Sequence, residues 1–241
     1  MTDRSQNLAR LLITTGILLT GILHGGTASG LNWDYHPIAD MGPGVLSFAI
    51  GDIEGDGTQK IYTSAPGCYQ LISYQWESSS YQPDTLLYTY PQLEAGLFLT
   101  GDVDGDGREE LYVVSKYGLK RLFQMSFDGA DYDLVELGTI SESTIAAFLV
   151  GDGDNDGRDE IYVGSWTELF QFDWTESGWE QHSIGLPSQC LWDVTLGDPE
   201  NDGNNALYMT GDSYDYDSVY RIAWNGSAWQ SEEAFTCWDL Y

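Results

Sequence analysis

Residues 101–115 read GDVDGDGREELYVVS, an acidic, glycine-rich turn that runs directly into a strand-like segment. Asp102, Asp104 and Asp106 alternate along the turn, and Gly107 follows them. The residues that come next are rich in the β-branched and aromatic types that favour strands. Such a stretch fits a metal site, a catalytic carboxylate cluster or a charged turn.

The same stretch occurs four times along the chain. The copies begin at Gly51, Gly101, Gly151 and Gly197, so that successive copies are 50, 50 and 46 residues apart. The other three read GDIEGDGTQKIYTS, GDGDNDGRDEIYVGS and GDPENDGNNALYMTG. A catalytic cluster needs to occur only once, whereas four copies in step indicate one structural turn in each unit of a repetitive fold.

A second marker repeats in step with the first: two aromatic residues separated by four turn-forming residues. The four intervening stretches, ESSS, DGAD, TESG and NGSA, are typical of hairpin loops. We expect each pair to flank a hairpin and to pack across its two strands. The pairs are Trp76 with Tyr81, Phe127 with Tyr132, Trp174 with Trp179, and Trp224 with Trp229.

Each unit divides into four short strands, which in the second unit are predicted at 96–102, 110–115, 119–127 and 132–140. Turn signals recur at short intervals and helical periodicity is absent after residue 30, which indicates an all-β fold. Four strands in a unit of this length match the blade of a β-propeller. The sequence therefore predicts a propeller of four-stranded antiparallel blades.

Partial repeats flank the four complete blades. Residues 31–41, LNWDYHPIADM, look like the fourth strand of a preceding blade, because Trp33 stands where the fourth-strand tryptophans stand. Residues 236–241, TCWDLY, match QCLWDV at 189–194 and predict the start of another first strand. Either four blades close a ring with extra strands, or the ring is partial and further blades are missing or come from another segment or chain.

The composition excludes one class of partner. The chain of 241 residues carries 9 lysines and arginines against 38 aspartates and glutamates, a formal charge of -29. Phosphate backbones repel such a chain, so nucleic acid binding through a basic surface is excluded, and anionic membrane surfaces are disfavoured. The hydrophobic content of 42% is ample for a core.

Residues 1–30 differ in character from the rest. Arg4 and Arg10 precede the apolar run LLITTGILLTGILHGG at 11–26, and the small residues TASG follow. This order is that of a secretory signal peptide, and an uncleaved N-terminal anchor is the alternative. Both readings place residues 31–241 outside the cytoplasm, as a secreted, periplasmic or cell-surface domain that meets the membrane only through an uncleaved leader.

The three cysteines, Cys68, Cys190 and Cys237, indicate neither a disulfide framework nor a zinc site, because their number is odd and no CxxC spacing occurs. One bridge with one remaining thiol is compatible with them.

The acidic loops have the donor chemistry of a calcium site. Alternating carboxylates before a glycine turn bring several oxygens around one point, and hard oxygen ligands without His or Cys select Ca²⁺. We expect the carbonyls of Arg108 and Arg158 to be main-chain ligands, by analogy with other DxDxDG loops. The predicted side-chain ligands of the two strong sites are Asp102, Asp104, Asp106 and Glu110 in the second loop, and Asp152, Asp154, Asp156 and Glu160 in the third.

The outer two loops have fewer acids and are predicted to bind Ca²⁺ more weakly. Lys60 and Ala206 stand where the second and third loops have their last glutamate. The remaining candidate ligands are Asp52, Glu54 and Asp56 in the first loop, and Asp198, Glu200 and Asp202 in the fourth. An EF-hand is excluded, because the loop leads into a strand and not a helix.

Four copies of GD-x-[DE]-x-[DN]-G-x-x-x-[IL]-Y closely resemble the FG-GAP or VCBS repeat, found in integrin α-subunit propellers and in many secreted bacterial proteins. The resemblance covers residues 31–241. It implies a β-propeller with Ca²⁺ held in the turn between the first and second strands of each blade, usually as a binding or adhesion module.

Three functions remain open at this point. The first is a non-catalytic, calcium-stabilised extracellular module that binds a protein or a glycan. The second is a polysaccharide lyase or hydrolase, although no GxSxG or HExxH motif occurs and His36 and His182 look like repeat-structural residues. The third is an anchored subunit of an envelope complex. The non-repeated segment 211–221, GDSYDYDSVYR, is the place where specialised function is most expected, and an acidic hairpin is its alternative reading.

Overall fold

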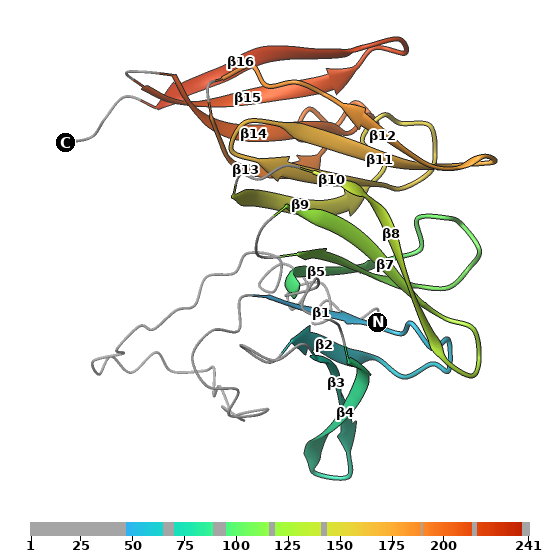
Figure 1. The fold of residues 1–241 in the computed structure, drawn as a ribbon. Helices are drawn as coiled ribbons and strands as arrows, with labels where there is room; N and C mark the ends of the chain where they lie inside the picture. The colour runs from blue at the N-terminus through green and yellow to red at the C-terminus, as the bar shows by residue number, and fades with distance from the viewer. Residues whose placement is uncertain are drawn as a thin grey trace, which may run out of the picture. The chain divides into compact units, whose positions relative to one another are not determined.

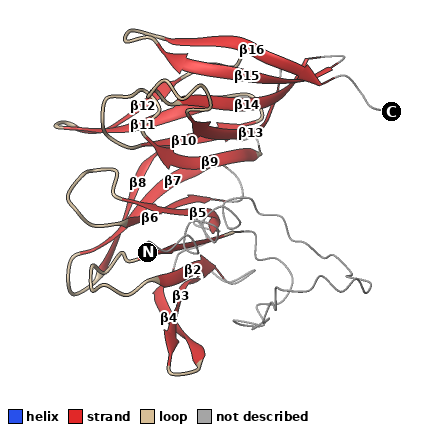
Figure 2. Cartoon of the chain, turned by 180° about the vertical axis from the view of Figure 1, so that it is seen from behind, coloured by secondary structure: helices blue, strands red, loops and turns tan. Residues whose placement is uncertain are grey.

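The computed structural model describes residues 47–64, 70–88, 95–115, 119–140, 144–188, 190–213 and 216–237. These residues form sixteen strands in four antiparallel sheets of four strands each, with no helix among them (Figure 1). Figure 2 shows the strands in red and the loops that join them in tan. A helix able to span a membrane is accordingly not found in these ranges.

Several sequence predictions fall outside these ranges. The leader at 1–30, the partial fourth strand at 31–41 and Cys68 belong to residues that the structure does not describe, so these predictions stay predictions. Cys190, at the start of the thirteenth strand, is a free thiol.

The strands of each sheet are consecutive in the chain. The first sheet contains β1 (Phe48–Gly51), β2 (Lys60–Ser64), β3 (Gln70–Glu77) and β4 (Ser80–Tyr88). The second contains β5 (Ala95–Gly101), β6 (Glu110–Ser115), β7 (Arg121–Phe127) and β8 (Tyr132–Thr139). The third contains β9 (Ile145–Gly151), β10 (Glu160–Ser165), β11 (Leu169–Thr175) and β12 (Gly178–Ser183). The fourth contains β13 (Cys190–Gly197), β14 (Ala206–Ser213), β15 (Tyr216–Trp224) and β16 (Trp229–Cys237). The predicted strands of the second unit agree with β5 to β8 to within two residues at each end.

The aromatic pairs flank the hairpins between third and fourth strands, as predicted. In every sheet the two aromatic residues are direct partners across the ladder, and their ring centroids lie 5.0 to 5.7 Å apart. Rings at this separation stabilise the two strands beyond the area they bury.

The second strands explain why the sheets occur in series. All six residues of β6 and all six of β10 are buried, because each strand is covered on both of its faces. In β6, Leu111 and Val113 face the first sheet, whereas Tyr112 and Val114 face the third. A strand with apolar residues on both faces is stable only between two neighbouring sheets.

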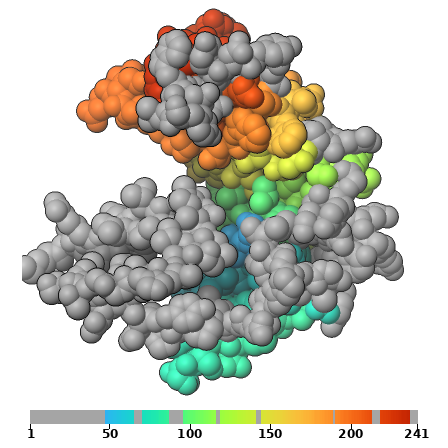
Figure 3. All heavy atoms as spheres, turned by 90° about the vertical axis from the view of Figure 1, so that its left-hand side faces the viewer, coloured from blue at the N-terminus to red at the C-terminus, as the bar shows by residue number. Residues whose placement is uncertain are grey.

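Three hydrophobic cores lie between consecutive sheets, one for each pair. Figure 3 colours the chain from blue to red in this order. The first strands β1, β5, β9 and β13 adjoin one another in turn. This arrangement of blades confirms the all-β, propeller-like fold. The first and fourth sheets are not joined within the described ranges, so the four blades form a partial ring.

One detail at the C-terminal end differs from the prediction. Thr236 and Cys237, expected to begin a further first strand, end β16 instead, where they pair with Ser218 and Asp217. The reason is that β15 begins at Tyr216 and offers backbone partners to both residues. Residues 238–241 lie outside the described ranges.

Candidate metal centres in the acidic loops

The four acidic loops share one backbone shape, between the first and second strands of their sheets. Each loop turns through two residues with left-handed φ angles. The first has φ between 54° and 71° and is Gly55, Gly105, Asn155 or Asn201. The second has φ between 86° and 91° and is Gly57, Gly107, Gly157 or Gly203. Glycine and asparagine tolerate this region best, which explains why only these residue types occur at the two positions.

The first aspartate of each loop fixes the turn. One carboxylate oxygen accepts a hydrogen bond from the backbone N–H of the second left-handed glycine, five residues later. The four N···O distances are 2.7 Å at Asp52, 3.0 Å at Asp102, 3.1 Å at Asp152 and 2.8 Å at Asp198. In the two inner loops, this turn places the alternating aspartates close to one another.

The third loop assembles the complete carboxylate set predicted from the sequence. One oxygen from each of Asp152, Asp154, Asp156 and Glu160 lies within 4.8 Å of the others. Glu160 is 3% exposed, and its Oε2 accepts hydrogen bonds from Tyr162 Oη at 2.8 Å and from the Gly153 N–H at 3.1 Å.

The negative charges of the third-loop carboxylates have no basic ion-pair partner among the described residues. Burial raises the pKa of Glu160 to about 8, and the nearby carboxylate of Asp154 adds to the rise. Burial, together with the charge of Asp156, also raises the pKa of Asp154. Among the described residues, no lysine or arginine forms an ion pair with these carboxylates. A bound cation would remove the repulsion and favour the ionised forms.

The second loop is similar but more open. One oxygen from each of Asp102, Asp104 and Asp106 lies within 4.8 Å of the others, while Glu110 is not part of that group. Glu110 is nevertheless buried, accepts a hydrogen bond from Tyr112 Oη at 3.0 Å, and has its pKa raised to about 8 by burial and by Asp104.

Two further observations fit a hard cation in the second loop. Asp102 Oδ1 is buried without a hydrogen-bond partner, which is costly for an anionic acceptor unless something positive satisfies it. A hollow of about 240 Å³ lies over the loop, lined by Asp104, Asp106, Glu110 and Gln124 among others. Arg108 also lines this hollow. The carboxylates of the loop offer oxygen ligands, without sulfur or imidazole nitrogen, and such a set suits Ca²⁺ or Mg²⁺ and not zinc.

The first loop contains its own cation. Lys60 stands where Glu110 and Glu160 stand, is 9% exposed, and places its Nζ on Glu54 Oε2. Tyr132 of the next sheet donates its hydroxyl to the other oxygen, Glu54 Oε1. Both oxygens of the third-position acid are therefore occupied.

The fourth loop reaches a similar result with different residues. Ala206 supplies no carboxylate, and Glu200 accepts a hydrogen bond from Tyr208 Oη at 2.6 Å. Arg221, from β15, places its Nε 3.6 Å from Glu200 Oε1. Unlike the inner two loops, neither outer loop brings three carboxylates together within the described ranges.

Arg108 and Arg158 come two residues after Asp106 and Asp156. Each backbone N–H donates to that aspartate, at 2.9 Å in both cases. Their carbonyls stay predicted ligands.

One position on the third strands was not predicted from the sequence. Gln124, Gln171 and Arg221 pair directly with Tyr112, Tyr162 and Tyr208 of the second strands. Their common role becomes visible only from the strand register, because the loops between second and third strands differ in length.

The two glutamines tie the inner loops to the next sheet. Gln171 donates to Asp154 Oδ2 at 3.2 Å, and its Oε1 accepts the indole N–H of Trp229 at 3.0 Å. The ring of Trp229 also meets Tyr162 edge to face, with centroids 6.1 Å apart. In the second sheet, Gln124 accepts the indole N–H of Trp179 at 3.1 Å.

The other sequence candidates lie apart from the acidic loops. His182 is 52% exposed on β12, with its Nε2 3.3 Å from Asp173, while His36 lies outside the described ranges. The segment 211–221 forms the β14–β15 hairpin, of which residues 214–215 are not described.

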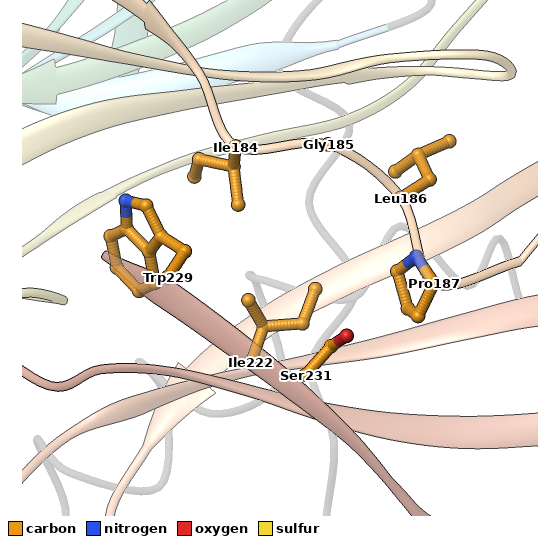
Figure 4. Close-up of a pocket in the computed structure, with 7 residues that line it drawn as sticks. All are labelled: Ile184, Gly185, Leu186, Pro187, Ile222, Trp229 and Ser231. Atoms are coloured by element: carbon orange, nitrogen blue, oxygen red, sulfur yellow. The ribbon is translucent and has the colours of Figure 1, made fainter.

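A hollow of about 120 Å³ lies under the linker between the third and fourth sheets. Ile184, Leu186 and Pro187 of the linker face Ile222 and Trp229 there (Figure 4). Sites for small-molecule ligands are usually ~300 Å³ or larger, so this hollow is too small for one.

A comparison with models of known protein families found no match, and no curated protein matched the sequence.

Glu110 and Glu160 predict how the stability of the metal-free protein depends on pH. The pKa of each carboxyl is about 8 in the folded protein against an ordinary value of 4.5. The unfolded chain therefore ionises at lower pH, and the stability that these groups contribute is fully present below about pH 4.5 and is lost as the pH rises toward about 8. We expect the melting temperature in EDTA, measured by circular dichroism, to fall between about pH 5 and pH 8.

Glu110→Gln and Glu160→Gln are the matched variants, because each removes one titrating group at nearly constant volume. Each should flatten part of the fall. A wild-type melting temperature that stays constant or rises across this range would contradict the prediction.

Proposed function

We propose that the protein is a non-catalytic, calcium-binding β-propeller module that acts outside the cytoplasm and binds a protein or glycan ligand. The contrast between inner and outer loops carries the proposal. Loops two and three gather carboxylates without a basic ion-pair partner, and Glu110 and Glu160 are buried there, whereas loops one and four pair Glu54 with Lys60 and Glu200 with Arg221. An external cation is the simplest way to compensate the charge of the inner loops.

In this proposal the inner loops hold one Ca²⁺ each. The ligands are Asp102, Asp104, Asp106 and Glu110 in one, and Asp152, Asp154, Asp156 and Glu160 in the other, with the carbonyls of Arg108 and Arg158. The ion supplies positive charge and couples the folding of the loop to external Ca²⁺. The weaker outer sites would use the acids that Lys60 and Arg221 leave free.

The loop motif and its blade spacing support a place for this chain among the FG-GAP or VCBS repeats, which we propose as its class. The same resemblance, with the leader-like residues 1–30, supports an extracellular location. Fold alone does not define the ligand.

An exposed pair of tryptophans is our candidate for the ligand surface. Trp166 is 46% exposed and Trp192 is 51% exposed, and their ring centroids lie 5.7 Å apart. Trp166 follows β10 and Trp192 lies near the start of β13, so both belong to the strand ends opposite the acidic loops.

The backbone around this pair is fixed, although the rings face solvent. The Trp166 N–H donates to Thr144 O at 3.2 Å, and Trp166 O accepts the N–H of Leu191 at 3.0 Å. Rigid, exposed aromatic rings are frequent anchors of binding surfaces. We therefore assign the metal to one end of the blades and the ligand to the other.

Counting bound ions tests the calcium proposal. Isothermal titration of the EDTA-treated protein should give two tight Ca²⁺ ions per chain. Asp104→Asn and Asp154→Asn should each remove one, because each variant removes one charged oxygen ligand from an inner loop. The control is Glu200→Gln in the fourth loop, which should retain both tight sites. Absence of tight binding, or loss of a tight ion in the control, would refute the assignment.

Replacement of Lys60 tests the role of the internal cation. Lys60→Glu restores the carboxylate that the inner loops have, so we expect a third tight Ca²⁺ ion and a lower melting temperature in EDTA. Lys60→Gln is the control: it should lower stability, because Glu54 loses its buried partner, without adding an ion. A stoichiometry unchanged by Lys60→Glu would show that the lysine does not decide occupancy.

The ligand surface is tested with a glycan array and with immobilised extracellular proteins, each in Ca²⁺. The double variant Trp166→Ala and Trp192→Ala should weaken binding about tenfold or more, because anchor residues commonly contribute more than ~1.4 kcal/mol. Trp76→Ala is the control, since Trp76 is 52% exposed on a hairpin away from this pair. Equal binding by the double variant and the wild type would place the ligand elsewhere.

A further inference from the structure

In the two end sheets, some repeat positions are more exposed than their buried or partly buried counterparts in the other sheets. Phe98, Phe148 and Val194 stand at one position of their first strands, and each packs into the core between its own sheet and the preceding one. Phe48 stands at the same position of β1 and is 46% exposed. Among the described residues, no other sheet packs on the face of the first sheet that carries Phe48.

The fourth sheet is open on its opposite face. Leu71, Leu122 and Leu169 share one register position on the third strands and are at most 1% exposed, because the next sheet covers them. At this position the fourth sheet has Val219, which is only half-buried. Its cross-strand partner Phe235 is 57% exposed, the largest value among the exposed hydrophobic residues described.

These two open faces are the two halves of one type of interface. In all three internal interfaces, the face that carries the leucines of one sheet packs on the face that carries the phenylalanine or valine of the next. The Val219 face of the fourth sheet corresponds to the leucine-bearing faces, and the Phe48 face of the first sheet corresponds to the faces with phenylalanine or valine. The side chains of the Val219 face are therefore expected to fit a Phe48 face and not a second Val219 face.

We propose that a second copy of this chain covers these faces, with the Phe48 face of one copy packed head to tail on the Val219 face of the other. The contact continues the series of interfaces already present three times within the chain. Such a contact is heterologous, and it closes a ring when the rotation between copies permits. The proposal goes beyond the calcium-binding function and does not depend on it.

The aromatic repeat identifies one pair of side chains that would meet. Tyr132, Trp179 and Trp229 lie in the first two residues of their fourth strands, and each packs against the preceding sheet. Trp229, for instance, lies on the ring of Tyr162. Tyr81 is the corresponding residue of the first sheet, and Tyr208 is the fourth-sheet counterpart of Tyr162. Tyr81 of the second copy would therefore lie on Tyr208.

Light scattering on the full chain tests the proposal, in excess Ca²⁺. The wild type should have the mass of two or more chains. Phe48→Asp and Val219→Asp should each give monomers, because each leaves only one kind of face intact. A mixture of the two variants should form a heterodimer, since one intact interface remains. Val135→Asp is the control, because Val135 is 52% exposed on β8 away from both faces, and it should behave as the wild type.

Several results would overturn the proposal. A monomeric wild type would mean that the faces are covered from within the chain or by another protein. Self-association of either single variant would indicate an interface between like faces. A mixture that stays monomeric, although both variants melt as the wild type does, would exclude head-to-tail pairing. Ca²⁺ stoichiometry is measured separately on each variant, so failure here and failure of the calcium proposal are distinguishable.

Discussion

The structure depends on one constraint: a four-stranded blade with apolar residues on both faces must be covered on both sides. In β6 and β10 every residue is buried, and neither strand has a polar face that could meet water. The free energy of the fold therefore comes from interfaces between sheets, as in other repeat architectures, and a single blade cannot be stable by itself. The acidic loops lie where such interfaces end.

Neighbouring loops are in contact as a result. The Asp52 N–H donates to Glu109 Oε2 of the next sheet at 2.6 Å, and Asn205 donates its side-chain N–H to Asp152 O at 2.8 Å. In the third sheet, Asp154 is linked through Gln171 to Trp229 of the fourth. A cation bound in that loop would therefore stabilise the interface and not only the turn. Lys60 and Arg221 give the outer loops a comparable charge balance without an ion.

The repeated blades and the aromatic hairpins could be predicted from the sequence. The 50-residue spacing, together with the paired aromatic residues, predicted the blades and their hairpins, because both signals are local and repeat in step. Lys60 and Ala206 predicted that the outer loops lack the last carboxylate, since they replace an acid at a known loop position, and neither outer loop gathers three carboxylates within the described ranges. The roles of Gln171 and Arg221 could not be predicted, because these residues come from another strand and reach the loop through strand register. The exposure of Phe48 likewise depends on which neighbours a face has.

Anomalous diffraction from crystals grown with Ca²⁺ is the most direct test of the central claim, that inner and outer loops differ in metal binding. Strong calcium peaks are expected among the carboxylates of Asp102 and Asp152 and their loop partners, with weak or absent peaks beside Lys60 and Ala206. Equal peaks in all four loops, or none in the inner two, would contradict it.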